Sequence, residues 1–117
     1  MPIKAKWVPF KKEIIENLSL TESGVYEIGR LRGNVVLYIG KSDKSIRSRL
    51  LNHREKTAFA TCTHFRKRKT SSEDATKAED RLLSEFKKRY GKYPELNKYK
   101  SPKQDSLYNS LSRFFKV

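Results

Sequence analysis

A tyrosine and two arginines stand close together in the segment LYIGKSDKSIRSRLLNH, which runs from Leu37 to His53. Its strand-like apolar part ends at Tyr38-Ile39-Gly40, and the residues that follow predict a helix. At about 100° per residue, one face of that helix carries Ile46, Arg49, Leu50 and His53, whereas Arg47 points elsewhere. An arginine among apolar residues that dock on a sheet either extends to solvent or contacts an anion, and the helical phase alone leaves both interpretations open.

A carboxylate within an apolar stripe is the second feature that suggests chemistry. The residues from about Ser71 to Tyr90 predict a long helix whose apolar stripe consists of Ala75, Leu82, Leu83, Phe86 and Tyr90. Glu79 projects into the middle of this stripe. Burial of a carboxylate costs several kcal/mol unless it is paired or holds a metal. Glu79 is therefore either half of a buried ion pair or a metal ligand.

The charge of the chain indicates an anionic partner. Lysine and arginine number 27 against 13 acidic residues, which gives a formal net charge of +14 over 117 residues. Nucleic acid is the commonest partner of so basic a chain, and an acidic membrane surface is the alternative. No run approaches the ~20 apolar residues of a membrane span. We therefore expect nucleic acid as the partner and no membrane.

Cysteine content and the N-terminal residues bear on the compartment. Cys62 is the single cysteine, which excludes an internal disulfide and a zinc site built from cysteines. Residues 1–10 contain no uninterrupted apolar region of the kind that a secretory signal requires. We expect a cytoplasmic, intracellular protein in a reducing environment. The length and the 36% hydrophobic content predict a single domain over residues 1–117.

The strands that must carry these side chains predict a small antiparallel sheet. β-branched and aromatic residues predict strands at 24–29 and 34–40, joined as a hairpin. A third strand is expected around 59–68. The second strand is apolar almost throughout, which predicts that both faces of the sheet are covered. The fold class is α+β, a three-stranded antiparallel sheet flanked by helices in the order β-β-α-β-α.

Capping residues delimit the predicted helices. Ser42 or Asp43 can cap a helix over 44–54, and Gly91 stops the helix that begins near Ser71. The core of the domain is expected at about 22–98. Helical extensions are expected on either side of it, within residues 1–20 and within residues 101–116. The first spans Phe10 to Leu18, and the second carries Leu107, Leu111, Phe114 and Phe115 on one face.

Several short motifs follow one another in an order typical of one nuclease family. Gly24-Val25-Tyr26 opens the first strand, and Tyr38-Ile39-Gly40 closes the second. The arginine-bearing helix follows, then Glu79 in the pattern Ala-Glu-x-x-Leu-Leu, then Tyr90-Gly91-Lys92-Tyr93-Pro94-x-x-Asn97. The chain resembles the GIY-YIG nuclease family over about residues 24–97. Each tripeptide alone would be a weak motif, whereas the order and the strand contexts make the combination specific.

The resemblance implies a role for each matching residue. Tyr26 corresponds to the tyrosine proposed as the general base or as part of the base relay, and Tyr38 to the tyrosine that helps to position the attacking water. Arg49 corresponds to the arginine that contacts the scissile phosphate, with Arg47 as the alternative because the spacing from Tyr38 is one residue longer than in many members. Glu79 corresponds to the carboxylate that holds the metal, Mg2+ or Mn2+. The other matches are Asn97, which supports the site by hydrogen bonding, and the supporting residues Gly24, Gly40, Lys41 and His53.

A basic stretch with an aromatic residue covers the second half of the predicted third strand. His64-Phe65-Arg66-Lys67-Arg68-Lys69 suggests contacts with backbone phosphates, and a solvated sheet edge is the alternative. We expect nucleic-acid contacts from Arg47, Arg66, Lys67, Arg68 and Lys69.

Two classes of function fit these features. The first is a divalent-metal-dependent endonuclease that hydrolyses DNA phosphodiester bonds, as the resemblance implies. The alternative is a basic DNA-binding module without catalysis, or an adaptor in a repair complex. A role in DNA repair, restriction, mobile-element transfer or phage biology stays open, as does DNA versus RNA. We expect a monomer or weak dimer, within a larger complex or alone.

Overall fold

The computed structural model describes residues 3–97 and has the α+β architecture that the sequence predicts. Its strands are β1 (Val8–Pro9), β2 (Gly24–Arg30), β3 (Val35–Ser42) and β4 (His64–Lys69). Its α-helices are α1 (Lys12–Ile15), α2 (Ile46–Arg54) and α3 (Ser72–Tyr90). Two 3-10 turns complete the order, η1 (Thr57–Phe59) after α2 and η2 (Glu95–Asn97) after α3. Within this part of the chain, no helix has the length and apolar character needed to cross a membrane.

The sheet has four strands in the order β1-β4-β2-β3, and every neighbouring pair is antiparallel. The predicted three-stranded sheet is therefore correct for β2, β3 and β4 but lacks one strand. The missing strand, β1, consists of two residues, Val8 and Pro9, which pair with Phe65 and His64. Proline cannot donate to a strand ladder but is tolerated at a sheet edge. So short a strand carries no alternating pattern from which it could be predicted.

Local capping chemistry sets the helix bounds. The Ser71 hydroxyl accepts from the backbone N–H of Asp74, and Gly91 ends α3 in the left-handed conformation, as predicted. The N-cap of α2 is Ser45 rather than Ser42 or Asp43, so this helix begins two residues later than predicted. The predicted helix from Phe10 to Leu18 is limited to α1. The predicted helix over residues 101–116 lies outside the described residues.

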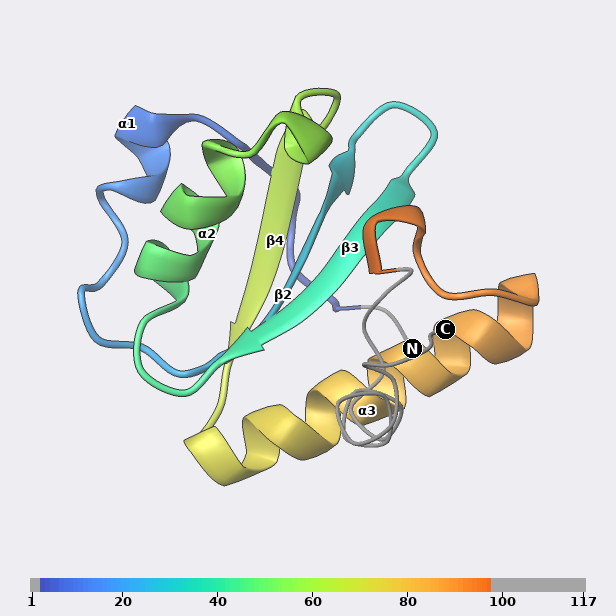
Figure 1. Cartoon of the computed structure of the whole chain (residues 1–117). Coiled ribbons are helices and arrows are strands. Elements are labelled where there is room, and N and C mark those ends of the chain that lie inside the picture. Colours follow the sequence, from blue (N-terminus) through green and yellow to red (C-terminus); the bar gives the residue numbers. More distant parts are fainter. Residues whose placement is uncertain (1–2, 98–117) are drawn as a thin grey trace, which may run out of the picture.

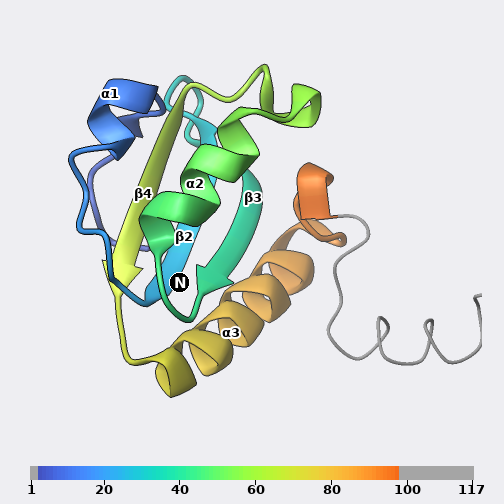
Figure 2. The ribbon, with the colours of Figure 1, turned by 60° about the vertical axis from the view of Figure 1, so that its left-hand side comes forward.

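Both faces of the sheet are covered, as the apolar second strand predicts (Figure 1). On one face, α1 and α2 cover a core that includes Tyr26, Ile28 and Phe65. On the other face, α3 covers Val25 and Ile39. Strand alternation produces this division, because successive side chains point to opposite faces. Helices α2 and α3 both begin at the end of the sheet where β3 and β4 terminate (Figures 1 and 2).

Candidate active site

Three rings from three elements meet between the sheet and α2. Tyr26 of β2 and Tyr38 of β3 are stacked, with ring centroids 6.2 Å apart. His53 of α2 lies 4.7 Å from the Tyr38 ring, and its Nε2 is 2.9 Å from the Tyr26 hydroxyl. Phe59 of η1 closes the cluster at 4.6 Å from His53. The sequence did not single out Phe59, because its place beside the site depends on how the chain folds back after α2.

Glycine at position 40 is a steric requirement of this cluster. Gly40 pairs with Tyr26 across the β2–β3 ladder. A Cβ at this position would lie 2.7 Å from the Tyr26 hydroxyl and 2.7 Å from the Tyr38 ring. The Tyr26 ring therefore passes over bare backbone. Glycine is required at position 24 for a similar steric reason, because a Cβ there would lie 2.1 Å from the backbone oxygen of Arg68.

The two candidate arginines are separated by helical phase. Arg49 hydrogen-bonds to Tyr26 and lies near enough to Tyr38 and Glu79 for their charges to act on it. Arg47 turns away, and its Nε donates to the backbone oxygen of Glu16 at 3.4 Å. The structure thus brings Arg49, rather than Arg47, to the tyrosines. The face shared with Ile46 and Leu50, both fully buried, determines this outcome.

The Tyr26 hydroxyl has two hydrogen-bond partners, Arg49 and His53. A guanidinium only donates, so the Tyr26 oxygen accepts from Arg49. The Tyr26 hydroxyl also lies 2.9 Å from Nε2 of His53, and it donates to this nitrogen in the His53 tautomer protonated at Nδ1. Burial of the fully covered Tyr26 raises its pKa well above 10, and the nearby Tyr38 adds to that rise. Arg49 opposes the increase in pKa, because its charge favours the phenolate.

Glu79 is buried where helical phase predicts, on the face of α3 that contacts the sheet. Only 1% of the residue is exposed. Its carboxylate acts electrostatically on both Tyr26 and Arg49. The structure therefore brings the single carboxylate of the predicted set to the same site as the tyrosines and the arginine.

Asn97 supports the site through the backbone of β3. Its Oδ1 accepts from the Ile39 N–H at 2.7 Å, and its Nδ2 donates to the Ile39 oxygen at 2.9 Å. Strand β3 is an edge strand, so these two backbone groups point away from β2 and need partners. Asn97 supplies both, and Ile39 lies between Tyr38 and Gly40. Asn97 therefore holds the β3 backbone next to Tyr38.

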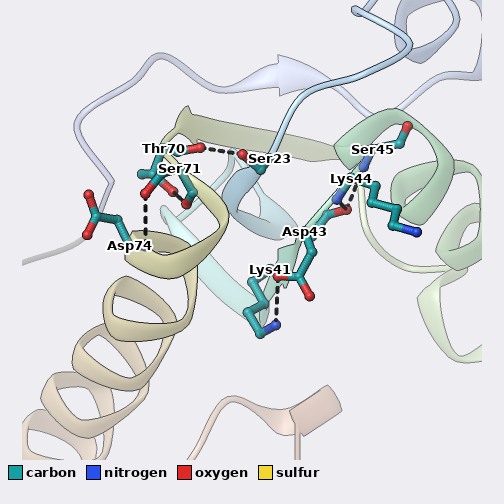
Figure 3. A network of polar contacts seen from close by, with 9 residues as sticks. Ser23, Lys41, Asp43, Lys44, Ser45, Thr70, Ser71 and Asp74 are labelled. Carbon is teal, nitrogen blue, oxygen red and sulfur yellow. Dashed lines mark hydrogen bonds and ion pairs between the residues drawn. The ribbon is translucent and has the colours of Figure 1, made fainter.

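A cationic cavity opens beside Arg49, at the end of the sheet where α2 begins. It has a volume of about 320 Å³ and is lined by Lys41, Ser42, Asp43, Lys44 and Arg49. Lys41 and Asp43 form an ion pair at 3.1 Å (Figure 3). The start of α3 lies nearby, where Ser23 donates to the Thr70 oxygen (Figure 3). The sequence flagged Lys41, but Lys44 was missed because only the turn after β3 brings it to the cavity.

The residues of the site are compatible with one divalent cation. Among residues 3–97 no group of three or more His, Cys, Asp or Glu side chains is arranged to hold a metal. Mg2+ commonly binds through one or two carboxylates and completes its shell with waters and substrate phosphates. Glu79 is an oxygen donor of the appropriate kind, and the Asp43 carboxylate at the neighbouring cavity is paired with Lys41. The donor set therefore fits Mg2+ or Mn2+ better than a metal that needs several nitrogen or sulfur ligands.

The basic stretch on β4 divides into a buried half and an exposed half. Arg66 is buried, forms an ion pair with Glu27 at 2.7 Å and lies over the Trp7 ring at 4.2 Å. Its guanidinium lies between these two partners, so the predicted contact with phosphate would require Arg66 to leave them. Lys67 is half-buried, with Nζ 2.9 Å from Glu22. The two residues that remain exposed are Arg68 and Lys69.

Comparison of the chain with family models, with curated proteins and with solved structures gave no match.

Proposed function

We propose that this chain is a divalent-metal-dependent endonuclease that hydrolyses DNA phosphodiester bonds by GIY-YIG-type chemistry. The observation that carries the proposal is the meeting of Tyr26, Tyr38, Arg49, His53 and Glu79, which come from four separate elements. A basic chain that only bound DNA would gain nothing from a buried carboxylate beside its arginine. Such a carboxylate opposes phosphate binding and costs free energy to bury.

Arg49 is the residue that first contacts the substrate in this proposal. Its guanidinium is exposed at the cationic cavity and presents donors in the fork geometry that suits phosphate oxygens. In the absence of DNA, Arg49 lies against the Tyr26 hydroxyl. Contact with the scissile phosphate draws it outward and opens a path from the cavity to Tyr26. Stabilisation of charge on the phosphoryl oxygens is then its catalytic contribution.

Tyr26 and His53 provide the route for the proton of the attacking water. The water oxygen forms a bond to phosphorus while its proton passes to the Tyr26 oxygen, and the bond from phosphorus to the leaving oxygen breaks. The leaving oxygen takes a proton from solvent. With His53 in the tautomer protonated at Nδ1, the original Tyr26 proton passes at the same time to Nε2 of His53, along the 2.9 Å hydrogen bond. His53 becomes an imidazolium and Tyr26 stays neutral. The raised pKa of Tyr26 disfavours a phenolate base. In this relay Tyr26 transfers a proton without becoming a phenolate.

Glu79 holds the divalent cation in this proposal, Mg2+ or Mn2+. The bound cation supplies charge stabilisation for the transition state and the leaving oxygen. Asn97 keeps Tyr38 in place by fixing the backbone of Ile39.

The decisive experiment incubates the purified protein with plasmid DNA in Mg2+ or in chelator. We expect cleavage that requires the metal and falls by orders of magnitude in Glu79→Gln, because the cation loses its carboxylate. The matched control is Asp80→Asn, which removes the same charge from the next, exposed residue and should cut at the parent rate.

Two results would contradict the proposal in different ways. A parent protein that binds DNA tightly but never cuts it would be the binding module. A Glu79→Gln variant that unfolds, while Asp80→Asn does not, would identify Glu79 as half of a structural ion pair.

A further inference from the structure

An apolar groove lies on the face of the sheet that α3 covers, away from the Tyr26–His53 cluster. Its volume is about 420 Å³. Its apolar walls come from the edge of β3, the second half of α3 and the turn after it, namely Val36, Ile39, Leu82, Phe86, Tyr90 and Tyr93. Tyr90 remains 57% exposed, one of the most exposed large apolar side chains among residues 3–97. So much apolar surface in a concave site is typical of a docking surface.

The described chain ends beside this groove. Tyr93 and Glu95 line it, and Asn97 is hydrogen-bonded to Ile39, which is also part of its lining. Three residues separate Asn97 from Ser101, which makes four steps from one Cα atom to the next. They span at most roughly 14 Å when extended, which suffices to bring the following segment to the groove.

The sequence of residues 101–116 has the anchors that such a groove accepts. Leu107, Leu111 and Phe114 follow an i, i+4, i+7 spacing, and Phe115 extends the same face. Ser101-Pro102-Lys103-Gln104 has the cap, the proline and the glutamine of a helix start. Amphipathic helices bind apolar grooves through anchors at this spacing.

We propose that the groove is the docking site of the chain's own segment 101–116, bound through the apolar face that carries Leu107, Leu111 and Phe114. Attachment through a short linker makes docking intramolecular, with an effective concentration on the order of millimolar. A second copy or another protein must exceed that concentration to displace the segment. The docked segment covers Tyr90 and Phe86 and adds to the core around Ile39.

Docking also affects the backbone that carries Tyr38. The turn η2 lies against β3 through the two hydrogen bonds of Asn97. A segment docked immediately after η2 restrains Asn97 and, through Ile39, the position of Tyr38. This consequence rests on the contacts of Asn97 and not on the proposed nuclease activity.

Paramagnetic relaxation in the 117-residue chain tests the proposal. A nitroxide label on Arg89→Cys, at the rim of the groove, should broaden the amide signals of residues 107–115 by more than half. The same label on Lys11→Cys, which precedes α1 on the opposite face of the sheet, should leave them sharp. Burial raises the pKa of the Cys62 thiol to about 11, so labelling at neutral pH is confined to the introduced cysteine.

Matched variants and a mixing experiment complete the test. Phe114→Asp should abolish the broadening from the Arg89→Cys label, whereas Asn109→Asp, on the opposite side of the predicted helix, should retain it. The amide signals of the sheet residues show whether each variant is folded. A parent protein without broadening, or with broadening from Lys11→Cys alone, overturns the proposal. Broadening in a mixture of labelled and isotope-enriched unlabelled chains would assign the groove to a second copy and overturn it equally.

Discussion

The hydrogen bond between Arg49 and Tyr26 distinguishes two arginines that lie two positions apart. Arg47 donates instead to a backbone oxygen near α1. If Arg49 stabilises charge on the scissile phosphate, removal of its side chain should slow the chemical step. We expect Arg49→Ala to lower the single-turnover cleavage rate roughly 100- to 1,000-fold, as for other transition-state donors. The measurement uses enzyme in saturating excess over DNA, so that all the DNA is bound and weaker binding does not lower the measured rate.

Arg47→Ala is the matched control, since it removes the same group from the same helix. Its hydrogen bond is exposed, and an exposed polar contact contributes about 1 kcal/mol or less. We expect its single-turnover rate to stay within about fivefold of the parent rate. Equal losses in the two variants would mean that the site does not distinguish them and that phosphate is bound by the helix as a whole.

The buried Tyr26 hydroxyl predicts a pH dependence of stability. An unfolded tyrosine ionises near pH 10, whereas the pKa of Tyr26 in the folded protein is well above 10. Between these two pKa values the folded state keeps a proton that the unfolded state releases. Its contribution to stability is therefore complete below about pH 10 and is lost as the pH rises further, by up to about 1.4 kcal/mol per pH unit.

Denaturant titrations from about pH 9 to about pH 11 measure this loss. The free energy of unfolding should fall less steeply in Tyr26→Phe than in the parent. Tyr90→Phe, which alters an exposed tyrosine, should follow the parent. Parallel curves for all three proteins would show that Tyr26 ionises as readily when folded as when unfolded.

At the scale of elements, interactions within a few residues were predictable and those between distant segments were not. The cap at Ser71 and the stop at Gly91 are read from neighbouring residues, and the structure has both. Glu79 was found because helical periodicity relates residues of one helix. The partner of Arg66 was not found, because Glu27 lies 39 positions away and becomes its neighbour only when β4 pairs with β2.

The same distinction applies to Asn97. Its match to a motif predicted that it supports the site, but not which atoms it would bond. Its two partners on Ile39 follow from β3 being an edge strand. Sheet order is set by the packing of the whole chain, and it cannot be obtained from the residues around Asn97.

The Glu27–Arg66 pair predicts a non-additive effect on stability. Its side chains are only 2% and 9% exposed, and burial raises the pKa of Glu27 while Arg66 opposes that rise. Glu27→Leu leaves a buried guanidinium without its carboxylate. We expect it to lower the free energy of unfolding by about 3–5 kcal/mol. The double variant Glu27→Leu/Arg66→Met should recover most of that loss, because an apolar pair of similar volume replaces the ion pair.

Urea titration of the parent, both single variants and the double variant completes the cycle. Arg66→Met separates the charge of Arg66 from its contact with the Trp7 ring, since methionine retains apolar contact there. A double variant as unstable as Glu27→Leu would mean that packing, and not the unpaired charge, accounts for the loss.

For the whole molecule, the placement of charge matters more than its sum. The formal charge of +14 does not say where DNA would bind. The row Lys69, Gly24 and Ser42 runs across β4, β2 and β3 at the end of the sheet where the cationic cavity opens. Neighbouring strands lie about 4.8 Å apart, so this row spans roughly 10 Å. A DNA backbone bound at Arg49 would therefore also pass Arg68 and Lys69.

This placement predicts which lysines and arginines contribute to the salt dependence of DNA binding. Each phosphate contact adds about 0.9 to the slope of log K against log salt concentration. Arg68→Ala/Lys69→Ala should reduce that slope by about 1.8 and weaken binding to unrelated sequences alike, because phosphate contacts carry no sequence information. Lys11→Ala/Lys12→Ala removes the same charge near α1, which lies toward the opposite end of β4 (Figure 1). That control should retain the parent slope. A reduction of equal size in both double variants would mean that the total charge, and not a surface around Arg49, attracts DNA.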